Sequence, residues 1–147
     1  MNKFIILRGI QGSGKTTYAK EWVIKDPDNR IRFSNDDLRN MCGQYWVPSR
    51  EEFISNVKTS FIIKALDMKY DIIIDNMNLN PKELSWLKYI VASHEHTNEY
   101  DAETIDFKTP LNVCIERDAK RPNPIGKEVI TKTYERYKWL YEDQLIN

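Results

Sequence analysis

The sequence predicts an α/β fold, a three-layer sandwich in which a parallel sheet of four or five strands is flanked by helices on both faces. Short apolar runs alternate with helix-periodic segments along the 147 residues. The run at residues 72–74 is apolar at every position, which is typical of a strand buried on both faces. A glycine-rich turn at residues 9–16 joins the first strand to the first helix. Because such sheets use right-handed crossovers, the loops at the carboxyl ends of the strands are expected to form the site.

The first half of the chain contains two expected strands and three helical segments. The strands cover about residues 3–8 and residues 31–33. The helical segments begin at residues 14, 36 and 51, and the longest of them reaches about residue 68. This last helix repeats apolar side chains every four residues, and we expect that stripe to face the core: Phe53, Val57, Phe61 and Ala65.

The second half continues the alternation. We expect the strand at 72–74 to lie beside the first strand, and a helix to begin at Pro81 with one apolar face. Residues 104–108 are predicted as a strand and are followed by a short helix that residues 120–126, with two prolines, cannot continue. The final helix carries apolar and aromatic residues at helical spacing, which indicates packing: Ile130, Tyr134, Tyr137, Leu140 and Tyr141.

Length and composition point to one cytoplasmic domain over residues 1–147. Hydrophobic residues make up 41% and charged residues 30% of the chain, which excludes disorder and a membrane-spanning protein. The first strand begins almost at the N-terminus, where a signal peptide would need its own segments. The formal net charge of zero argues against extended electrostatic wrapping of a duplex, although it permits the gripping of a short end.

Cysteine and histidine usage does not indicate a metal centre. Cys42 and Cys114 lie far apart without metal-type spacing, so we expect reduced structural thiols. His94 and His96 occupy alternate positions that do not face one another on a helix, so we expect an exposed helix end there.

Residues 9–16 have the spacing of a phosphate-binding P-loop between a strand and a helix, which predicts binding of ATP or GTP. Glycines let successive backbone N–H groups point at phosphate oxygens, and the helix that follows adds its positive end. Lys15 is expected to contact the outer phosphates, and the Thr16 hydroxyl is expected to bind Mg²⁺. The nucleotide-binding residues are therefore Gly9, Gln11, Gly12, Ser13, Gly14, Lys15, Thr16 and Thr17.

Three further loops supply polar residues suited to phosphoryl transfer. Asp36 is a candidate general base, with a helix N-cap as its structural alternative, and Arg39 one turn later can hold an anionic part of the acceptor. Asp75 ends a buried strand, where a carboxylate can bind Mg²⁺. Asp37 is the better candidate for the cap. The basic stretch at residues 117–121 suits either a solvated helix end or a lid over the phosphates.

The chain resembles the kinase domain of the phage-type polynucleotide 5′-hydroxyl kinases nearly end to end. The resemblance rests on residues 9–17, 35–39, 78–81 and 117–121, with Pro124 and Ile125 shortly after. It implies an ATP-dependent transfer of the γ-phosphate to a 5′-hydroxyl end of DNA or RNA. By resemblance, Lys15 and Thr16 act on ATP and Mg²⁺, Asp36 is the base, and Arg39 and Asn78 lie on the acceptor side. Arg117 and Arg121 become lid residues on the ATP phosphates, with Arg121 catalytic.

Two features leave alternatives open. The strand-end carboxylate stands one place earlier than in the family's usual run, so either Asp75 or Asn76 fills that position, and a one-residue slip reverses a side chain's face. Better-known members also carry a 3′-phosphatase domain, and these residues cover only the kinase part.

The acceptor also remains open between a polynucleotide end and another alcohol, such as a hydroxymethyl-pyrimidine in DNA, a nucleoside or a small metabolite. Tyr45 and Trp46 would either stack on a base or pack on the core. A nucleotide-dependent switch is disfavoured, because no Asn-Lys-x-Asp guanine-reading motif follows the first strand.

Overall fold

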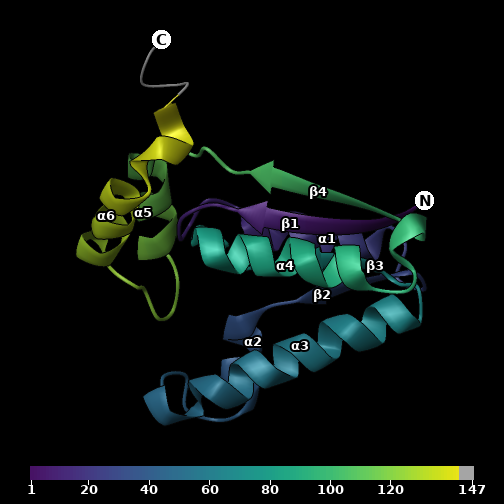
Figure 1. The fold of residues 1–147 in the computed structure, drawn as a ribbon. Coiled ribbons are helices and arrows are strands. Elements are labelled where there is room, and N and C mark those ends of the chain that lie inside the picture. Colours follow the sequence, from purple (N-terminus) through teal and green to yellow (C-terminus); the bar gives the residue numbers. More distant parts are fainter. Residues whose placement is uncertain (143–147) are drawn as a thin grey trace.

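A computed structural model describes residues 1–142 of the chain. Its sheet has four parallel strands in the order β2-β3-β1-β4, namely β1 (Asn2–Arg8), β2 (Arg30–Phe33), β3 (Asp71–Ile74) and β4 (Tyr100–Asp106). The adjacency of β3 and β1 confirms the expected pairing, with Ile5 opposite Ile73. All carboxyl ends lie at the same edge, toward α5 and α6 in Figure 1. The fold predicted from the alternation of strands and helices is therefore confirmed.

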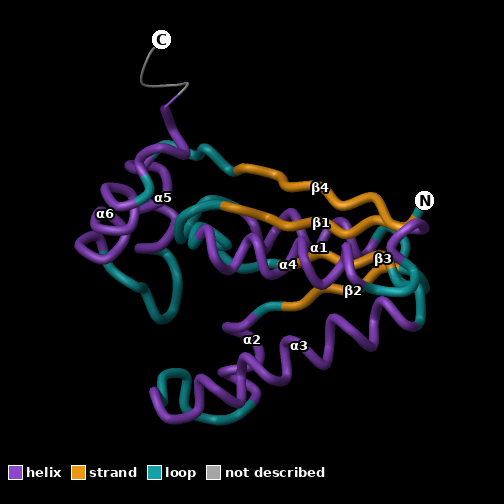
Figure 2. Tube along the Cα trace, in the orientation of Figure 1, coloured by secondary structure: helices purple, strands orange, loops and turns teal. Residues whose placement is uncertain are grey.

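Six helices surround this sheet and place the loops of the site. They are α1 (Lys15–Ile24), α2 (Asn35–Met41), α3 (Glu51–Asp67), α4 (Pro81–Ser93), α5 (Leu111–Ala119) and α6 (Lys127–Arg136). Short 3₁₀ turns occur at Pro48–Arg50, Thr97–Glu99 and Lys138–Tyr141. Figure 2 shows α1 and α4 on opposite sides of the strands, with α5 and α6 beyond their carboxyl ends.

Alternation along β1 divides the core into two layers around the sheet. Phe4 and Ile6 belong to the larger cluster, which α3 and α4 complete. Ile5 and Leu7 face the opposite cluster, which Ala19 of α1 joins. Because side chains alternate between the faces of a strand, a run that is apolar at every position fits a strand covered on both sides.

The strand β4 differs from its prediction at residues 104–108. It begins at Tyr100 and pairs along all seven residues of β1. The start of β4 was not predicted because Asp101 and Glu103 interrupt any apolar pattern there. Both are exposed, which is possible because β4 is an edge strand with a neighbour on only one side.

The inward stripe expected on α3 is partly wrong. Ala65 is buried as predicted, but the other buried positions follow the predicted ones by one residue: Ile54, Lys58, Ile62 and Leu66. Val57 and Phe61 pack beside that stripe, but Phe53 is 53% exposed. The first turn of α3 extends past the carboxyl edge of the sheet (Figure 1).

The second half otherwise follows the sequence prediction. Leu87 and Val91 are buried on α4, and α5 ends at Ala119 before the proline-containing segment. The expected packing of the C-terminal aromatics is confirmed in a third cluster, where Ile130, Leu140 and Tyr141 are buried and Tyr134 and Tyr137 pack against them. That helix is interrupted at Tyr137, which separates α6 from the last 3₁₀ turn.

Histidine and cysteine positions differ in part from expectation. The His94 and His96 side chains follow the end of α4 but are 9% and 23% exposed, so an exposed helix end is wrong. His94 Nε2 lies 2.7 Å from an Asp67 carboxylate oxygen, which covers that ring. Cys42 and Cys114 are both free, but Cys42 is exposed and not a core thiol. Within residues 1–142, no group of three His, Cys, Asp or Glu side chains is placed to hold a metal ion.

No helix in the described part of the chain has the length and apolar character needed to cross a membrane.

Candidate active site

The P-loop connects β1 to α1 through two glycines in conformations that other residues adopt rarely. Gly12 has φ 77° and Gly14 has φ 102°. A Cβ on Gly12 would also lie 2.5 Å from the carbonyl oxygen of Cys114 in α5. Gly14 caps α1 without a side-chain hydrogen bond, so the first amides of the helix have no acceptor within it. These amides and the helix dipole together form an anion-binding end.

The Lys15 ammonium group lies inside the curl of this loop. Its Nζ donates to the carbonyl oxygens of Gly9 and Ile10, each at 2.9 Å, and to Ser13 Oγ at 3.2 Å. The residue is 8% exposed, and burial lowers its pKa to about 8. The loop therefore holds a cation of reduced basicity where the backbone amides converge.

Two other predicted P-loop residues contribute differently. Gln11 Nε2 donates to Thr133 Oγ1 of α6 at 3.2 Å, so its side chain joins the loop to the C-terminal helices. Only the backbone of Gln11 is then available to a phosphate. Thr17 is exposed in the first turn of α1, beside the Thr16 hydroxyl.

A polar chain links the start of α1 to the ends of β2 and β3. Thr16 Oγ1 donates to Asp75 Oδ2 at 2.9 Å. The same oxygen accepts a hydrogen bond from Arg32 Nε at 2.8 Å and forms an ion pair with Arg32 Nη2 at 2.7 Å. The Asp75 side chain is 3% exposed and that of Arg32 is 13% exposed. Arg32 thus neutralises the buried Asp75 carboxylate. It also contacts the exposed carboxylate of Asp37 in α2.

The oxygen donors of Thr16 and Asp75 fit a magnesium ion. A threonine hydroxyl and a carboxylate are the hard ligands that Mg²⁺ prefers, and it completes its shell with phosphates and water. Their 2.9 Å separation places both oxygens on one side of the P-loop. The P-loop kinase fold implies ATP and typically Mg²⁺, and these side chains agree with that implication.

The neighbouring residue Asn76 lies on a different side of the strand end. Its Oδ1 accepts a hydrogen bond from the backbone N–H of Asn35 at 2.9 Å, at the start of α2. Of the two alternatives left by the sequence, Asp75 is therefore the one that contacts the P-loop helix.

Asn78 is directed at the strands. Its Nδ2 donates to the carbonyl oxygen of Leu7 at 2.6 Å and to that of Ile74 at 3.3 Å. The residue is 5% exposed and has φ 51°. This amide ties the ends of β1 and β3 together, so its contacts within the chain are structural, and a substrate contact stays a prediction.

The predicted acceptor side of the site is centred on Asp36 in the first turn of α2. Its Oδ1 accepts hydrogen bonds from Arg39 Nη1 at 2.8 Å and from the Tyr45 hydroxyl at 2.9 Å. Its other oxygen, Oδ2, accepts none from residues 1–142, and the side chain is 59% exposed. Asp36 therefore presents one fixed and one open carboxylate oxygen.

Arg39 is held from two directions. Beyond Asp36, its Nε and Nη2 donate to the Glu51 carboxylate at 3.0 Å and 2.6 Å. This bidentate pair raises the pKa of Arg39 and lowers that of Glu51. Arg39 thus fixes the first turn of α3 to the first turns of α2.

The cap of α2 corrects the sequence prediction. Ser34 is the N-cap, and its Oγ accepts a hydrogen bond from the Asp37 backbone N–H at 3.3 Å. Asp37 is not the cap, because it lies inside the first turn of α2, where its carboxylate pairs with Arg32. Asp36 also lies inside that turn, so the N-cap alternative for Asp36 is excluded and its role as a base stays a prediction.

The basic segment, here residues 117–126, begins in the last turn of α5, and its Arg117 lies beside the P-loop. A Cβ on Gly14 would be 3.3 Å from Arg117 Nη1. Arg117, Lys120 and Arg121 are exposed, and no carboxylate among residues 1–142 forms an ion pair with them. Asp118, 2% exposed, anchors the segment by accepting hydrogen bonds from the N–H groups of Ile125 at 3.0 Å and Gly126 at 2.9 Å.

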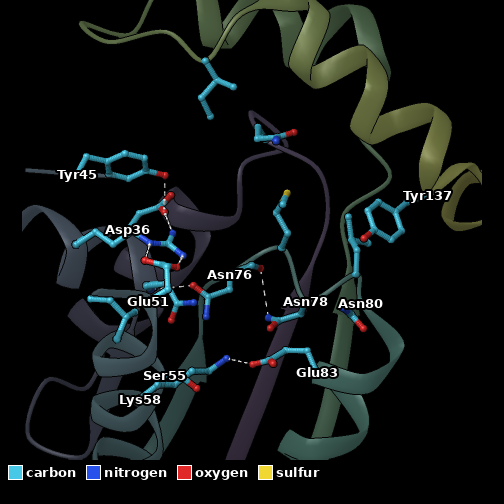
Figure 3. Close-up of a pocket in the computed structure, with 17 residues that line it drawn as sticks. Asp36, Tyr45, Glu51, Ser55, Lys58, Asn76, Asn78, Asn80, Glu83 and Tyr137 are labelled. Atoms are coloured by element: carbon cyan, nitrogen blue, oxygen red, sulfur yellow. Dashed lines mark hydrogen bonds and ion pairs between the residues drawn. The ribbon is translucent and has the colours of Figure 1, made fainter. Parts of the chain in front are cut away.

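A single pocket of about 410 Å³ brings these loops together. Figure 3 shows Asp36, Tyr45 and Glu51 along one wall, with Asn78, Asn80 and Tyr137 opposite them. Gln11 of the P-loop and Ile125 of the basic segment also line it. The loops after β2 and β3 therefore line one pocket, with Gln11 as the P-loop residue in its lining, while Lys15, Thr16, Asp75, Arg117 and Arg121 lie outside that lining.

Sequence reasoning missed the partners that hold the site. Arg32 reads as the polar position of an alternating strand, and Glu51 as an ordinary acidic residue in a first helical turn. Lys58, which is 3% exposed and pairs with Glu83 at the pocket floor, interrupts an apolar stripe. Of these partners, only Lys58 could have been suspected from the sequence, because it is a charged residue between apolar positions of a helix.

Comparison with known proteins identifies relatives along nearly the whole chain. Residues 4–143 match the family model described as AAA domain. The chain is 32% identical over 136 residues to L-seryl-tRNA(Sec) kinase of Methanococcus maripaludis, covering 90% of this chain and 51% of that protein. It is 27% identical to a putative bifunctional polynucleotide kinase/RNA ligase of Autographa californica nuclear polyhedrosis virus, covering 92% of this chain and 21% of that protein.

Solved structures agree with these relatives. A chain of the Pnkp1/Rnl/Hen1 RNA repair complex superposes with a TM-score of 0.78 at 28% identity, covering 97% of this chain and 46% of that one. A shikimate kinase from Acinetobacter baumannii, at 12% identity and a TM-score of 0.55, shares the fold alone. The chain spans about half, or less, of the length of the relatives it matches in sequence.

Proposed function

Since this chain belongs to the AAA domain family and is a P-loop kinase that resembles polynucleotide kinases, we propose that it transfers the γ-phosphate of ATP to a 5′-hydroxyl end of DNA or RNA. We also propose that residues 1–147 form one kinase domain and that the chain acts in the cytoplasm. The observation that carries the proposal is the open carboxylate oxygen of Asp36 in a pocket that Gln11 of the P-loop also lines.

The nucleotide side of the proposed site uses the P-loop backbone from Gly9 to Thr17. Lys15 would exchange its carbonyl contacts for the β- and γ-phosphates, and Thr16 and Asp75 would hold Mg²⁺. When bound, Mg²⁺ supplies positive charge that stabilises the transferring group. The exposed guanidinium groups of Arg117 and Arg121 are suited to cover the same phosphates.

On the acceptor side, Asp36 acts as the general base. The acceptor oxygen forms a bond to the γ-phosphorus as the bond to the β-phosphate oxygen breaks, and ADP leaves. The proton of the acceptor hydroxyl passes to Asp36 Oδ2, because Arg39 and Tyr45 already occupy Oδ1. Arg39, which these contacts hold at the pocket wall, faces the phosphate that follows the terminal nucleoside.

One observation favours a second acceptor. The relative named L-seryl-tRNA(Sec) kinase is 32% identical to this chain, and its name describes transfer to a primary alcohol that is not a 5′ end. A seryl group on RNA therefore joins hydroxymethyl-pyrimidine DNA, nucleosides and small metabolite alcohols as alternatives.

The test is a transfer assay with Mg²⁺ and γ-labelled ATP. Acceptors are DNA and RNA oligonucleotides with free 5′-hydroxyls, 5′-phosphorylated controls, hydroxymethyl-pyrimidine DNA, seryl-tRNA and free nucleosides. We expect label on free 5′ ends only. Label on the blocked controls with none on free ends would refute the proposal. Label on one of the other acceptors with none on free ends would also refute it and would identify that acceptor as the substrate.

Two variants test the base, and a third tests the nucleotide site. Asp36→Asn should lower turnover at least 100-fold while ATP binding is retained, because the base contributes about 10²–10⁴-fold. Asp37→Asn is the matched control, since this neighbouring carboxylate pairs with Arg32 outside the pocket lining. Lys15→Ala should abolish transfer to every acceptor. Wild-type turnover in Asp36→Asn would show that another group accepts the proton.

A further inference from the structure

Tyr45 and Trp46 are exposed aromatic side chains at the acceptor side of the site. Tyr45 is 44% and Trp46 is 54% exposed, so neither packs in the core. Tyr45 lines the pocket, and its hydroxyl donates to Asp36 Oδ1 at 2.9 Å (Figure 3). Of the two readings that the sequence allowed, core packing is therefore excluded.

The backbone that carries both rings is fixed by one side chain. Arg50 donates from Nη1 to the carbonyl oxygen of Cys42 and from Nη2 to that of Arg39, each at 3.3 Å. Nη2 also contacts the carbonyl oxygens of Gln44 and Tyr45. A segment with this many hydrogen bonds to a single guanidinium loses little conformational freedom when a ligand binds.

Arg39 contacts both aromatic rings and Asp36. Its guanidinium carbon is 5.8 Å from the centroid of the Tyr45 ring and 5.7 Å from that of Trp46. These distances are within the range of a cation–π contact, which orients both rings about one cation. The same guanidinium binds Asp36, so the rings, the cation and the proposed base form one connected group.

We propose that Tyr45 and Trp46 form a stacking platform for the unpaired nucleobase at the 5′ end of a single strand, an inference that rests on the proposed function. Aromatic rings with an adjacent arginine are the usual elements of sequence-tolerant contacts to single-stranded nucleic acid. A net charge of zero argues against extended electrostatic wrapping of a duplex, so local contacts of this kind are suited to hold a short end. The platform would favour a frayed or single-stranded end over a paired one.

The contact between Tyr45 and Asp36 gives the platform a second consequence. The ring that would stack on the base also holds one oxygen of the carboxylate that would accept the proton. Stacking therefore places the terminal 5′-hydroxyl relative to Asp36 Oδ2. Tyr45 is a positioning residue for that carboxylate, in addition to its contact with the base.

The direct test is fluorescence of an oligonucleotide that carries 2-aminopurine at its 5′ terminus, bound to the protein with a non-hydrolysable ATP analogue. Stacking quenches this base without any reaction. We expect strong quenching by the wild type, and weak quenching by Trp46→Leu and Tyr45→Leu. Both variants should raise the oligonucleotide KM about tenfold or more while the KM for ATP is unchanged.

Two further variants separate the roles of the ring and the hydroxyl. Tyr45→Phe should retain quenching and KM but lower kcat, because the ring remains and the hydrogen bond to Asp36 is lost. Tyr89→Leu is the matched control, since this 68% exposed tyrosine lies on α4 and does not line the pocket. It should leave quenching, KM and kcat at wild-type values.

Quenching and KM that are unchanged in both Trp46→Leu and Tyr45→Leu would overturn the platform while leaving the kinase proposal intact. Absence of transfer from wild-type protein to any polynucleotide would instead overturn the proposed function. Melting temperatures and ATP affinity of each variant establish that it is folded.

Discussion

Arg32 makes the clearest energetic prediction in the molecule, because it neutralises a carboxylate that has almost no access to water. Its Nε and Nη2 lie 2.8 Å and 2.7 Å from Asp75 Oδ2, and the two side chains are 13% and 3% exposed. The perturbation is Arg32→Met, which keeps much of the apolar stem and removes the cation. Asp75 would then retain only the Thr16 hydroxyl as a partner among its present contacts.

The expected cost follows from the loss of one partner in a buried pair. Two unit charges about 4 Å apart interact by about 4 kcal/mol at an effective dielectric constant of about 20. Removal of one member of a buried pair typically costs about 3–5 kcal/mol, since the remaining charge is left uncompensated. We therefore expect Arg32→Met to lower the free energy of unfolding by about 3–5 kcal/mol. The contact of Arg32 with Asp37, whose side chain is 59% exposed, adds at most about 1 kcal/mol.

Urea denaturation at pH 7 measures this loss. With a slope of about 2 kcal/mol per molar urea, the midpoint should fall by about 2 M. The double variant Arg32→Met with Asp75→Asn should lose less than the sum of the single variants, because it leaves no buried unpaired charge. Lys3→Met, which removes an exposed pair with Asp101, should leave the midpoint unchanged.

A loss below about 1 kcal/mol in Arg32→Met would refute this reasoning. So would strict additivity in the double variant, since additive effects mean that the two side chains do not interact.

The remaining predictions concern the nucleotide site and the basic segment. ATP affinity should fall up to tenfold per pH unit above about pH 8. In the free protein the pKa of Lys15 is lowered to about 8, so above that pH the amine must regain a proton to bind phosphate. Calorimetry between pH 7 and pH 9.5 measures this affinity, and a flat pH profile would contradict the prediction. Gly12→Ala should be destabilising by several kcal/mol more than Gly43→Ala. Both glycines have positive φ, but only Gly12 faces the Cys114 carbonyl. Thermal unfolding compares the two variants, and equal losses of stability would show that the clash relaxes. Asp118→Ala should cost about 1.5–3 kcal/mol for each hydrogen bond lost to the basic segment and speed its amide exchange, and unchanged exchange would show that Asp118 does not anchor it.

The sequence predicted the parts of this site that local spacing determines. The P-loop was complete because its glycines, lysine and threonine follow one another between a strand and a helix. Asp36 and Asp75 were found because topology brings the ends of parallel strands to one edge. The structure places both beside the loops expected.

The partners of those residues could not be read from the sequence. Arg32 meets Asp75 only because β2 pairs with β3, with Phe33 opposite Ile74, and neither strand carries a local signal of that register. Ser34 and not Asp37 is the cap because α2 begins at Asn35, which places Asp37 inside the first turn, where its carboxylate pairs with Arg32. Phe53 was misplaced for a related reason, since helical spacing does not say where the covering layer ends.

The small third core has a consequence for communication between the two halves of the reaction. Ile10 from the ATP-binding loop and Leu79 from the loop on the acceptor side are both buried against Ile130 of α6. Two recognition surfaces thus share one set of packed methyl groups, and neither can shift without repacking the other. Ile130→Ala, a change outside the proposed site, should therefore lower the affinity for both ATP and the acceptor. The cluster would then couple the binding of the donor to the binding of the acceptor.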